Sequence, residues 1–347
     1  MSQEISKRKR DHLELCATDE VAFRERTHLL DHVKLLHQSL PDLHLDEDID
    51  LCIDLFGKKL RAPIVIAAMT GGTDEAGSVN EHLARLANRR GYGFGLGSQR
   101  AMQKRPDTAW TFRVREQAPD LLLLGNLGCV QARDTSSEAI QRLLDDVGAD
   151  AICVHMNPAM EMIQPGGDRN FRDVSKTFGR LCRELTVPVI GKETGSGISR
   201  ACAAKLLEQG VRHVDVSGAG GTSWVGVETL RAEGDARALG ELLWDWGIPT
   251  AAAIHYAVSA GLTAIATGGI RHGYDIARAI ALGADAAGVA RHVFKAYRAG
   301  GIAAADAFLR RCENELRTVM LLCGVSSIAQ LKQAPHIVTG ELREWIA

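Results

Sequence analysis

Short apolar runs alternate with longer amphipathic stretches from about residue 62 to about residue 299. Within each run the residues are continuously apolar instead of alternating with polar ones, which is typical of parallel strands buried on both faces. The predicted strands are 63–68, 92–96, 121–125, 151–155, 187–192, 213–217, 263–267 and 286–290. Helical spacing predicts helices over 78–90, 137–147, 199–209, 241–246 and 274–282.

Eight strand–helix repeats within one stretch predict an α/β fold, a (β/α)8 TIM barrel. A doubly wound sheet is the alternative, since it also alternates strands and helices. The strand count of eight favours the barrel, and so do the polar residues that follow nearly every strand. We therefore expect an N-terminal extension over 1–61, a barrel over 62–299 and a C-terminal helical tail of the same domain over 300–347.

Composition narrows the choice of partners. The chain is 46% hydrophobic and 24% charged with a net charge of −2, which argues against nucleic-acid binding. Acidic residues closely follow the basic run at 7–10. The first thirty residues lack the apolar core of a signal peptide, and no apolar run approaches the ~20 residues of a membrane span. The eight cysteines form no C-x-x-C pair, so we expect reduced thiols. Because the chain shows neither a signal peptide nor a membrane span, we expect no membrane partner and a cytoplasmic location.

In a barrel of this kind, the residues after the strands form the active face. After the seventh predicted strand come Gly268, Gly269 and Arg271, and after the eighth come Ala290 and Arg291. Glycine-rich turns expose backbone N–H groups, and the helix that starts near Tyr274 adds its positive end. The pattern predicts a phosphate site, although a tight turn alone would also use two glycines.

Lys192 ends the apolar run of the fifth strand. A buried ammonium is costly unless it is paired. Three interpretations stay open: a Schiff-base lysine, a cation beside an anionic reduced flavin, or a salt bridge to Glu193 or Glu161.

The fourth strand ends in His155 and Asn157, with Glu161 four residues later. A carboxylate near a phosphate site is suited to Mg²⁺, which takes one or two carboxylates together with phosphate oxygens. A surface glutamate and a hydrogen-bonded core histidine are the alternatives. At the N-terminus, Arg8, Lys9 and His12 form a basic cluster that could fold over a phosphorylated substrate.

These strand ends resemble the type 2 isopentenyl-diphosphate isomerases, a flavin-dependent family. The motifs that carry the resemblance are R-K-x-x-H at 8–12, M-T-G-G-T at 69–73, G-S-Q-R at 97–100, H-x-N at 155–157, G-D-R at 167–169, K-E-x-G-x-G at 192–197, D-V-S-G-A-G-G-T at 215–222, W-G-I-P-T at 246–250 and G-G-I-R at 268–271. They follow in order along nearly the whole chain.

The resemblance implies an FMN enzyme of isoprenoid biosynthesis that interconverts isopentenyl and dimethylallyl diphosphates, with Mg²⁺ and with NADPH as reductant. By motif, FMN would contact Ala68, Met69, Thr70, Ser98, Asn126, Lys192, Ser217, Thr222, Gly268, Gly269, Arg271, Ala290 and Arg291. The substrate would meet Arg8, Lys9, His12, Ser98, Gln99, Arg100, His155, Asn157 and Met160, with Glu161 as the metal ligand. The implied catalytic residues are Lys192, His155, Asn157 and Met160.

Met160 departs from the family motif H-x-N-x-x-Q-E, which has a glutamine here. Methionine is similar in length but offers no amide donor or acceptor. The chain is then either an isomerase that relies on flavin alone or an FMN enzyme for another isoprenoid diphosphate. A 2-hydroxy-acid oxidase is the third hypothesis, for which Arg271 and His272 match only part of the expected pattern. We expect a homo-oligomer, a tetramer or octamer.

Overall fold

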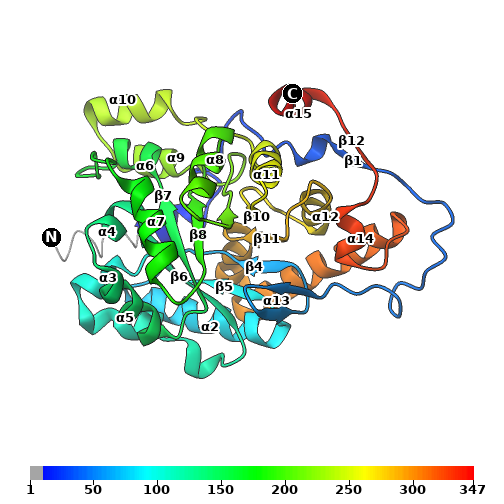
Figure 1. Cartoon of the computed structure of the whole chain (residues 1–347), viewed down its shortest axis with the longest axis horizontal. Helices are drawn as coiled ribbons and strands as arrows, with labels where there is room; N and C mark the ends of the chain where they lie inside the picture. The colour runs from blue at the N-terminus through cyan, green and yellow to red at the C-terminus, as the bar shows by residue number, and fades with distance from the viewer. Residues whose placement is uncertain (1–10) are drawn as a thin grey trace.

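A closed barrel of eight parallel strands forms the centre of the computed structural model, which describes residues 11–347 (Figure 1). Around the barrel the strands lie in the order β10–β11–β4–β5–β6–β7–β8–β9. Their bounds are β4 Ile64–Ile66, β5 Gly93–Gly95, β6 Leu122–Gly128, β7 Ala151–Met156, β8 Val189–Glu193, β9 His213–Asp215, β10 Thr263–Thr267 and β11 Ala286–Val289. Every predicted strand overlaps one of these, so the predicted TIM barrel is confirmed and the doubly wound sheet is wrong.

Helices surround the barrel in Figure 1 and join each strand to the next. The longer ones are α2 Asp74–Arg90, α5 Ser137–Val147, α7 Val174–Glu184, α8 Arg200–Glu208, α10 Gly234–Leu242, α11 Thr250–Ser259, α12 Gly273–Ala281 and α13 Arg291–Leu322. Short helices α3 Arg100–Lys104, α4 Cys129–Arg133, α6 Pro158–Ile163 and α9 Trp224–Thr229 follow strands β5, β6, β7 and β9. Local sequence sets the ends of α5: the Ser136 side chain accepts a hydrogen bond from the Ala139 amide, and Gly148 closes the helix in the left-handed conformation.

Two helix predictions need correction. Helix α2 begins four residues before the predicted 78–90, because Thr73 caps it and Asp74 and Glu75 occupy its first turn. The predicted helix 241–246 is mostly wrong, since α10 ends at Leu242. Beyond it the chain turns at Gly247, with a φ of 152°, and Pro249 forms a β-bridge with Ala219.

The apolar core has two layers. The larger lies between the strands and the surrounding helices, and the smaller fills the inside of the barrel with residues such as Leu122, Cys153 and Ile265. Leu55 and Leu60 join the inner layer from a hairpin of β2 Ile53–Leu55 and β3 Lys58–Leu60. The hairpin therefore packs against the inner core and leaves the opposite end of the barrel to the polar strand ends.

The extension and the tail meet. Strand β1 Val33–Leu35 pairs in antiparallel fashion with β12 His336–Val338. Helix α13 is broken at Gly300 and Gly301, and α14 Ile328–Lys332 and α15 Gly340–Ile346 complete the tail. The boundaries at 61/62 and 299/300 stay predictions.

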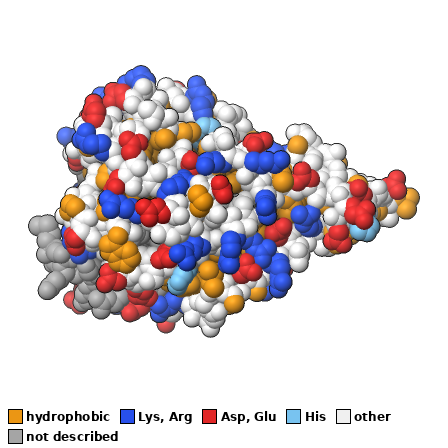
Figure 2. All heavy atoms as spheres, turned by 90° about the horizontal axis from the view of Figure 1, so that it is seen from below, with side chains coloured by type: hydrophobic (Ala, Val, Ile, Leu, Met, Phe, Trp, Pro, Cys, Tyr) orange, Lys and Arg blue, Asp and Glu red, His pale blue; other side chains and the backbone are white. Residues whose placement is uncertain are grey.

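Basic and acidic side chains are interspersed over the face shown in Figure 2, and a narrow projection extends from one end. Within residues 11–347, no helix has both the length and the apolar character needed to cross a membrane.

Candidate active site

A pocket of ≈ 260 Å³ lies at the carboxyl ends of the barrel strands, and its wall includes residues at the ends of all eight. Most predicted site residues line it: His12, Ala68, Met69, Thr70, Ser98, Arg100, Asn126, His155, Asn157, Met160, Glu161, Lys192, Ser217, Thr222, Gly268, Gly269, Ala290 and Arg291. The strand ends therefore converge on one site, as the barrel fold requires. Arg8 and Lys9 lie outside the described residues.

Two predicted residues lie elsewhere. Gln99 is 2% exposed; its amide nitrogen donates to the Leu143 carbonyl, and its amide oxygen accepts from the Asn126 backbone N–H at 3.0 Å. It joins the ends of β5 and β6 behind the pocket wall. The side chain of Arg271 is directed to carboxylates, with Nε 3.2 Å from Asp275 and Nη2 3.2 Å from Asp31. The predicted direct contacts of these two side chains with substrate and FMN do not follow from this arrangement.

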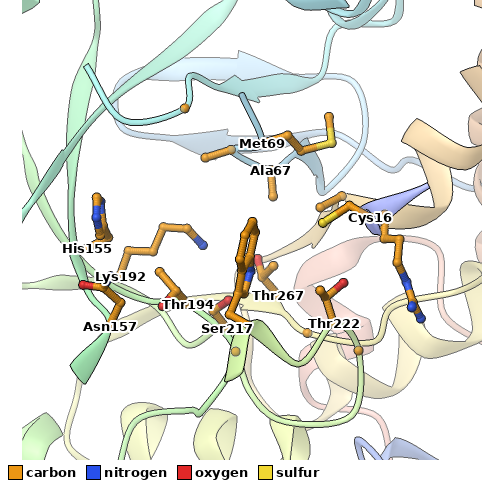
Figure 3. Close-up of a pocket in the computed structure, with 18 of the residues that line it drawn as sticks. Cys16, Ala67, Met69, His155, Asn157, Lys192, Thr194, Ser217, Thr222 and Thr267 are labelled. Carbon is orange, nitrogen blue, oxygen red and sulfur yellow. The ribbon is translucent and has the colours of Figure 1, made fainter. Parts of the chain in front are cut away.

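We call His155, Asn157, Met160 and Glu161 the β7 side of the pocket. His155 and Asn157 lie together at one edge in Figure 3. His155 Nδ1 is 2.7 Å from the side-chain oxygen of Asn126. Burial lowers the pKa of His155 to about 4, with Lys192 and Arg100 adding to the effect. The imidazole is therefore neutral near pH 7, with Nδ1 occupied by Asn126.

Glu161 is 7% exposed and well hydrogen-bonded. Asn157 donates to its Oε1 at 2.7 Å, and the Asp168 backbone N–H donates to its Oε2 at 2.7 Å. The other near contact of the Asn157 amide is the Met160 sulfur at 3.7 Å, a weak acceptor. A buried glutamate that accepts hydrogen bonds from these donors belongs to the pocket. The alternative prediction of a surface glutamate is therefore wrong.

The Lys192 ammonium is buried and lies 2.6 Å from Asp215 Oδ2. The two residues face each other because β8 and β9 pair in the register Lys192↔Asp215. Of the three interpretations, the salt bridge is therefore present, but its partner is Asp215 and not Glu193 or Glu161. In Figure 3 the Lys192 side chain extends from the His155 edge toward the middle of the pocket. A pocket-lining cation with a buried counter-ion suits the interpretation beside a flavin better than that of a Schiff base.

We call Thr267, Gly268, Gly269 and Arg291 the glycine corner. Arg291 opens α13, and its Nε and Nη1 are buried without a hydrogen-bond partner in the described part of the chain. Its nearest carboxylate oxygen in an ion pair, on Asp19, is 4.0 Å away. Thr267 Oγ1 is also buried and unpartnered. Because unpaired buried donors are costly, this corner is suited to hold an anion.

Glu193 supports the loop that follows β8. Its carboxylate accepts backbone hydrogen bonds from Thr194, Ser196 and Gly197. Burial raises the pKa of Glu193 to about 7, against the lowering effect of these N–H groups. The loop places Thr194 and Gly195 on the pocket wall.

The sequence interpretation missed part of the wall. Cys16, Thr194, Trp224 and Phe294 also line the pocket. Cys16 follows His12 by four residues in a helical stretch, so a helical reading of the extension would have placed both on one face. Thr194 and Trp224 each come two residues after a predicted motif residue, and that spacing is the only signal for them.

The extension is fastened beside the pocket by a charged network. His12 Nε2 lies 2.7 Å from Glu228 Oε1, and Arg231 donates to the other oxygen of Glu228 at 2.6 Å. Arg231 also bonds Asp11 at 3.1 Å. Glu228 is fully buried, and the network lowers its pKa against the opposing effect of burial. This network fixes the helical residues that bring His12 and Cys16 to the pocket.

Comparison with known proteins finds a matching family model and several similar enzymes. The model of the FMN-dependent dehydrogenase family matches residues 1–170 and 176–339. The isopentenyl-diphosphate delta-isomerase of Methanothermobacter thermautotrophicus is 42% identical over 99% of this chain and 96% of its own length. The Nostoc enzyme of the same name is 43% identical over 96% of both chains, and that of Methanococcoides burtonii is 44% identical over 98% and 95%.

The chain belongs to the isopentenyl-diphosphate delta-isomerase family. Within the broader FMN-dependent group, solved structures share the fold at low identity. A mandelate oxidase variant with a monooxide FMN adduct has a TM-score of 0.65 at 19% identity, covering 93% of each chain. A lactate oxidase from Pediococcus acidilactici has a TM-score of 0.69 at 16% identity, covering 98% of this chain and 94% of its own. These likenesses show the barrel fold alone and do not support the oxidase hypothesis.

The residues present fit the FMN of this isomerase family. The amides of Gly268 and Gly269 make no hydrogen bond within residues 11–347, and both glycines have positive φ. A Cβ on Gly268 would lie 2.2 Å from the Gly218 carbonyl oxygen, so only glycine permits this close approach. Free amides, the Arg291 Nε and Nη1 that lack hydrogen bonds, and a helix N-terminus form a donor set suited to a phosphate.

Proposed function

We propose that this protein interconverts isopentenyl and dimethylallyl diphosphates with FMN bound in the pocket. The observation that carries the proposal is that one pocket combines an unpaired donor set at the glycine corner with a hydrogen-bonded Asn157–Glu161 pair on the β7 side. A flavin phosphate and a substrate diphosphate can then occupy separate places. The relatives named for this reaction, each more than 40% identical over nearly the full length, support the choice.

The glycine corner would hold the FMN phosphate, and residues from four other strand ends would surround the rest of the cofactor. These are Ala68, Met69, Thr70, Ser98, Asn126, Ser217 and Thr222. The Lys192 ammonium, held in place by Asp215, would lie beside the ring, where its positive charge would favour an anionic reduced form. When bound and reduced, the flavin would supply acid–base chemistry at the alkene. NADPH is the reductant that we propose.

The β7 side would bind the diphosphate. Arg100 is part-exposed and lies 3.9 Å from Asp168, so its guanidinium can turn toward an anion. Asn157 can donate to a phosphate oxygen. The neutral His155 ring donates its Nδ1–H to the Asn126 oxygen, so its Nε2 is an acceptor and would bond a protonated oxygen or a water beside the diphosphate. His12, together with Arg8 and Lys9, would cover the substrate from the extension.

Glu161 is the proposed Mg²⁺ ligand. Among residues 11–347, no group of three or more His, Cys, Asp or Glu side chains could hold a metal ion. One carboxylate nevertheless fits an ion that arrives with the diphosphate, because Mg²⁺ often takes its remaining ligands from phosphate oxygens and water. The site would then take the metal together with the substrate.

Met160 supports a second candidate, an FMN enzyme for another isoprenoid diphosphate. Its sulfur, 3.7 Å from the Asn157 amide, gives the pocket an apolar, flexible wall next to the diphosphate side. Such a wall would accept a prenyl chain other than the five-carbon one. A homo-oligomer, either tetramer or octamer, and a cytoplasmic location are also part of our proposal.

Turnover of isopentenyl diphosphate tests the proposal. Protein with FMN, NADPH and Mg²⁺ is incubated with isopentenyl diphosphate, and the products are separated by chromatography. We expect dimethylallyl diphosphate from the wild type and a higher rate from Met160→Gln, by up to about 10²-fold, because a positioned amide is restored near the reacting carbons. No product from the wild type, but product from Met160→Gln, would favour the second candidate. No product from either protein would contradict the isomerase assignment.

A further inference from the structure

Three backbone segments lie in direct contact at the glycine corner. They are residues 27–31 of the extension, residues 218–221 after β9, and residues 268–271 after β10. A Cβ on Gly220 would lie 2.1 Å from the backbone nitrogen of His28, and one on Gly269 would lie 2.6 Å from the Gly220 carbonyl oxygen. The same Cβ on Gly269 would lie 3.0 Å from Cδ2 of the His28 ring. The His28 imidazole therefore packs against Gly269 without itself lining the pocket.

The His28 ring is fixed in one orientation. It is 2% exposed, and its Nδ1 accepts a hydrogen bond from the Leu30 backbone N–H at 3.0 Å. The proton of the neutral ring is therefore on Nε2, which is buried and has no partner in the described chain. The His28 carbonyl accepts from the Ala251 amide at 3.0 Å, which fastens the same residue to α11.

Ion pairs hold the far end of the 268–271 loop. Asp31 bonds Arg271 Nη2 at 3.2 Å and Arg278 Nη1 at 2.7 Å. Asp275 is fully buried and accepts the Arg271 backbone N–H at 3.0 Å. The extension thus contacts the glycine loop at both ends, through His28 below Gly269 and through Asp31 at Arg271.

We propose that His28 is a positioning residue for the flavin phosphate, holding the loops at Gly220 and Gly269 in the conformation that presents the free amides of Gly268 and Gly269. The inference rests on the proposed placement of the FMN phosphate at the glycine corner. His28 lies behind the backbone and touches no ligand. Its contribution depends on the ring filling the space under Gly269 and on the Nδ1 acceptor that ties the ring to Leu30.

Comparing FMN with riboflavin, which lacks the phosphate, tests the positioning role. Apoprotein is titrated with each flavin by fluorescence for the wild type, His28→Ala, His28→Gln and the control Glu341→Gln. Glu341 pairs with Arg26 of the extension in an exposed contact. We expect His28→Ala to weaken FMN about tenfold and riboflavin by less than about twofold, since only the phosphate contacts are loosened. His28→Gln should recover most of the affinity, because its amide oxygen can accept the Leu30 N–H. Glu341→Gln should match the wild type.

Three results would overturn parts of this account separately. Equal wild-type affinities for FMN and riboflavin would contradict the phosphate placement itself. A wild type that prefers FMN, with the same preference in His28→Ala, would contradict the positioning role alone. Equal losses in His28→Ala and His28→Gln would contradict the role of the Nδ1 acceptor.

Asp31→Asn, at a half-exposed side chain, is the second variant should His28→Ala not fold. It should weaken FMN binding about threefold and leave riboflavin binding unchanged. An unchanged FMN affinity would contradict the supporting role of the extension.

Discussion

The β7 side and the glycine corner of the pocket differ in how far their polar groups satisfy one another. On the β7 side, His155 is bonded to Asn126, and Glu161 accepts hydrogen bonds from Asn157 and Asp168. At the glycine corner, Nε and Nη1 of Arg291 and the Thr267 hydroxyl are buried without a hydrogen-bond partner in the described chain. Each unpaired buried group costs about 1–3 kcal/mol, so a ligand at the glycine corner gains that free energy when it binds.

This difference separates a resident group from an exchanging one. A cofactor that stays bound through many turnovers is suited to a side that is unsatisfied without it. A substrate that leaves after each turnover is suited to the β7 side, where the protein groups are already oriented by one another.

Lys192, whose side chain reaches from the β7 side toward the pocket centre, should give the largest effect. Lys192→Ala leaves the Asp215 carboxylate buried without its counter-ion at 2.6 Å. We expect the free energy of unfolding of the apoprotein to fall by about 3–5 kcal/mol in urea titrations. The control is Lys176→Ala, which removes an exposed pair with Asp173 and should leave the free energy of unfolding close to that of the wild type. Similar losses in both variants would show that the Lys192 pair is not an energetically special contact.

Arg291 and Arg100 should separate the two sides. Arg291→Ala should raise the Kd of FMN about 10- to 100-fold in a fluorescence titration, because a charged donor to the phosphate is lost. Once the protein is saturated with FMN, its KM for isopentenyl diphosphate should stay near that of the wild type.

Arg100→Ala is the matched variant on the diphosphate side. It should raise the KM for isopentenyl diphosphate about tenfold and leave the Kd of FMN unchanged. If each variant altered both constants to the same degree, the division of the pocket into two sides would be wrong.

The smallest effect concerns pH. Burial lowers the pKa of His155 to about 4, whereas an unfolded histidine titrates near 6.5. Between these values the unfolded chain binds more protons, so the stability that neutral His155 contributes declines as the pH falls through this window. From pH 7.5 to pH 5, wild-type apoprotein should lose about 2 kcal/mol more than His155→Gln in urea unfolding. An equal loss in both proteins would mean that His155 titrates normally.

The fold and most of the pocket wall could be predicted from the sequence because both depend on local patterns. Continuous apolar runs predict the strands, and the polar residues after them converge at one end of any closed barrel. Contacts set by the pairing of strands could not be read in the same way. The partner of Lys192 is Asp215, 23 positions away, because β8 and β9 pair in that register.

The direction in which side chains point was the second property that could not be predicted from the sequence. Gln99 and Arg271 belong to motifs whose neighbours line the pocket, yet Gln99 turns to Leu143 and Arg271 turns to Asp31 and Asp275. Position along the chain predicts which residues reach the active face but not which of them point into the cavity. For the same reason, nothing in the sequence linked His28 of the extension with Gly269.

The pocket is proposed to hold a resident flavin phosphate at the glycine corner and an exchanging substrate diphosphate on the β7 side. A crystal structure of the protein with FMN, Mg²⁺ and isopentenyl diphosphate tests it most directly. We expect the flavin phosphate at Gly268, Gly269 and Arg291, and the diphosphate with its Mg²⁺ at Asn157 and Glu161. A flavin phosphate on the β7 side, or a diphosphate at the glycine corner, would contradict the account.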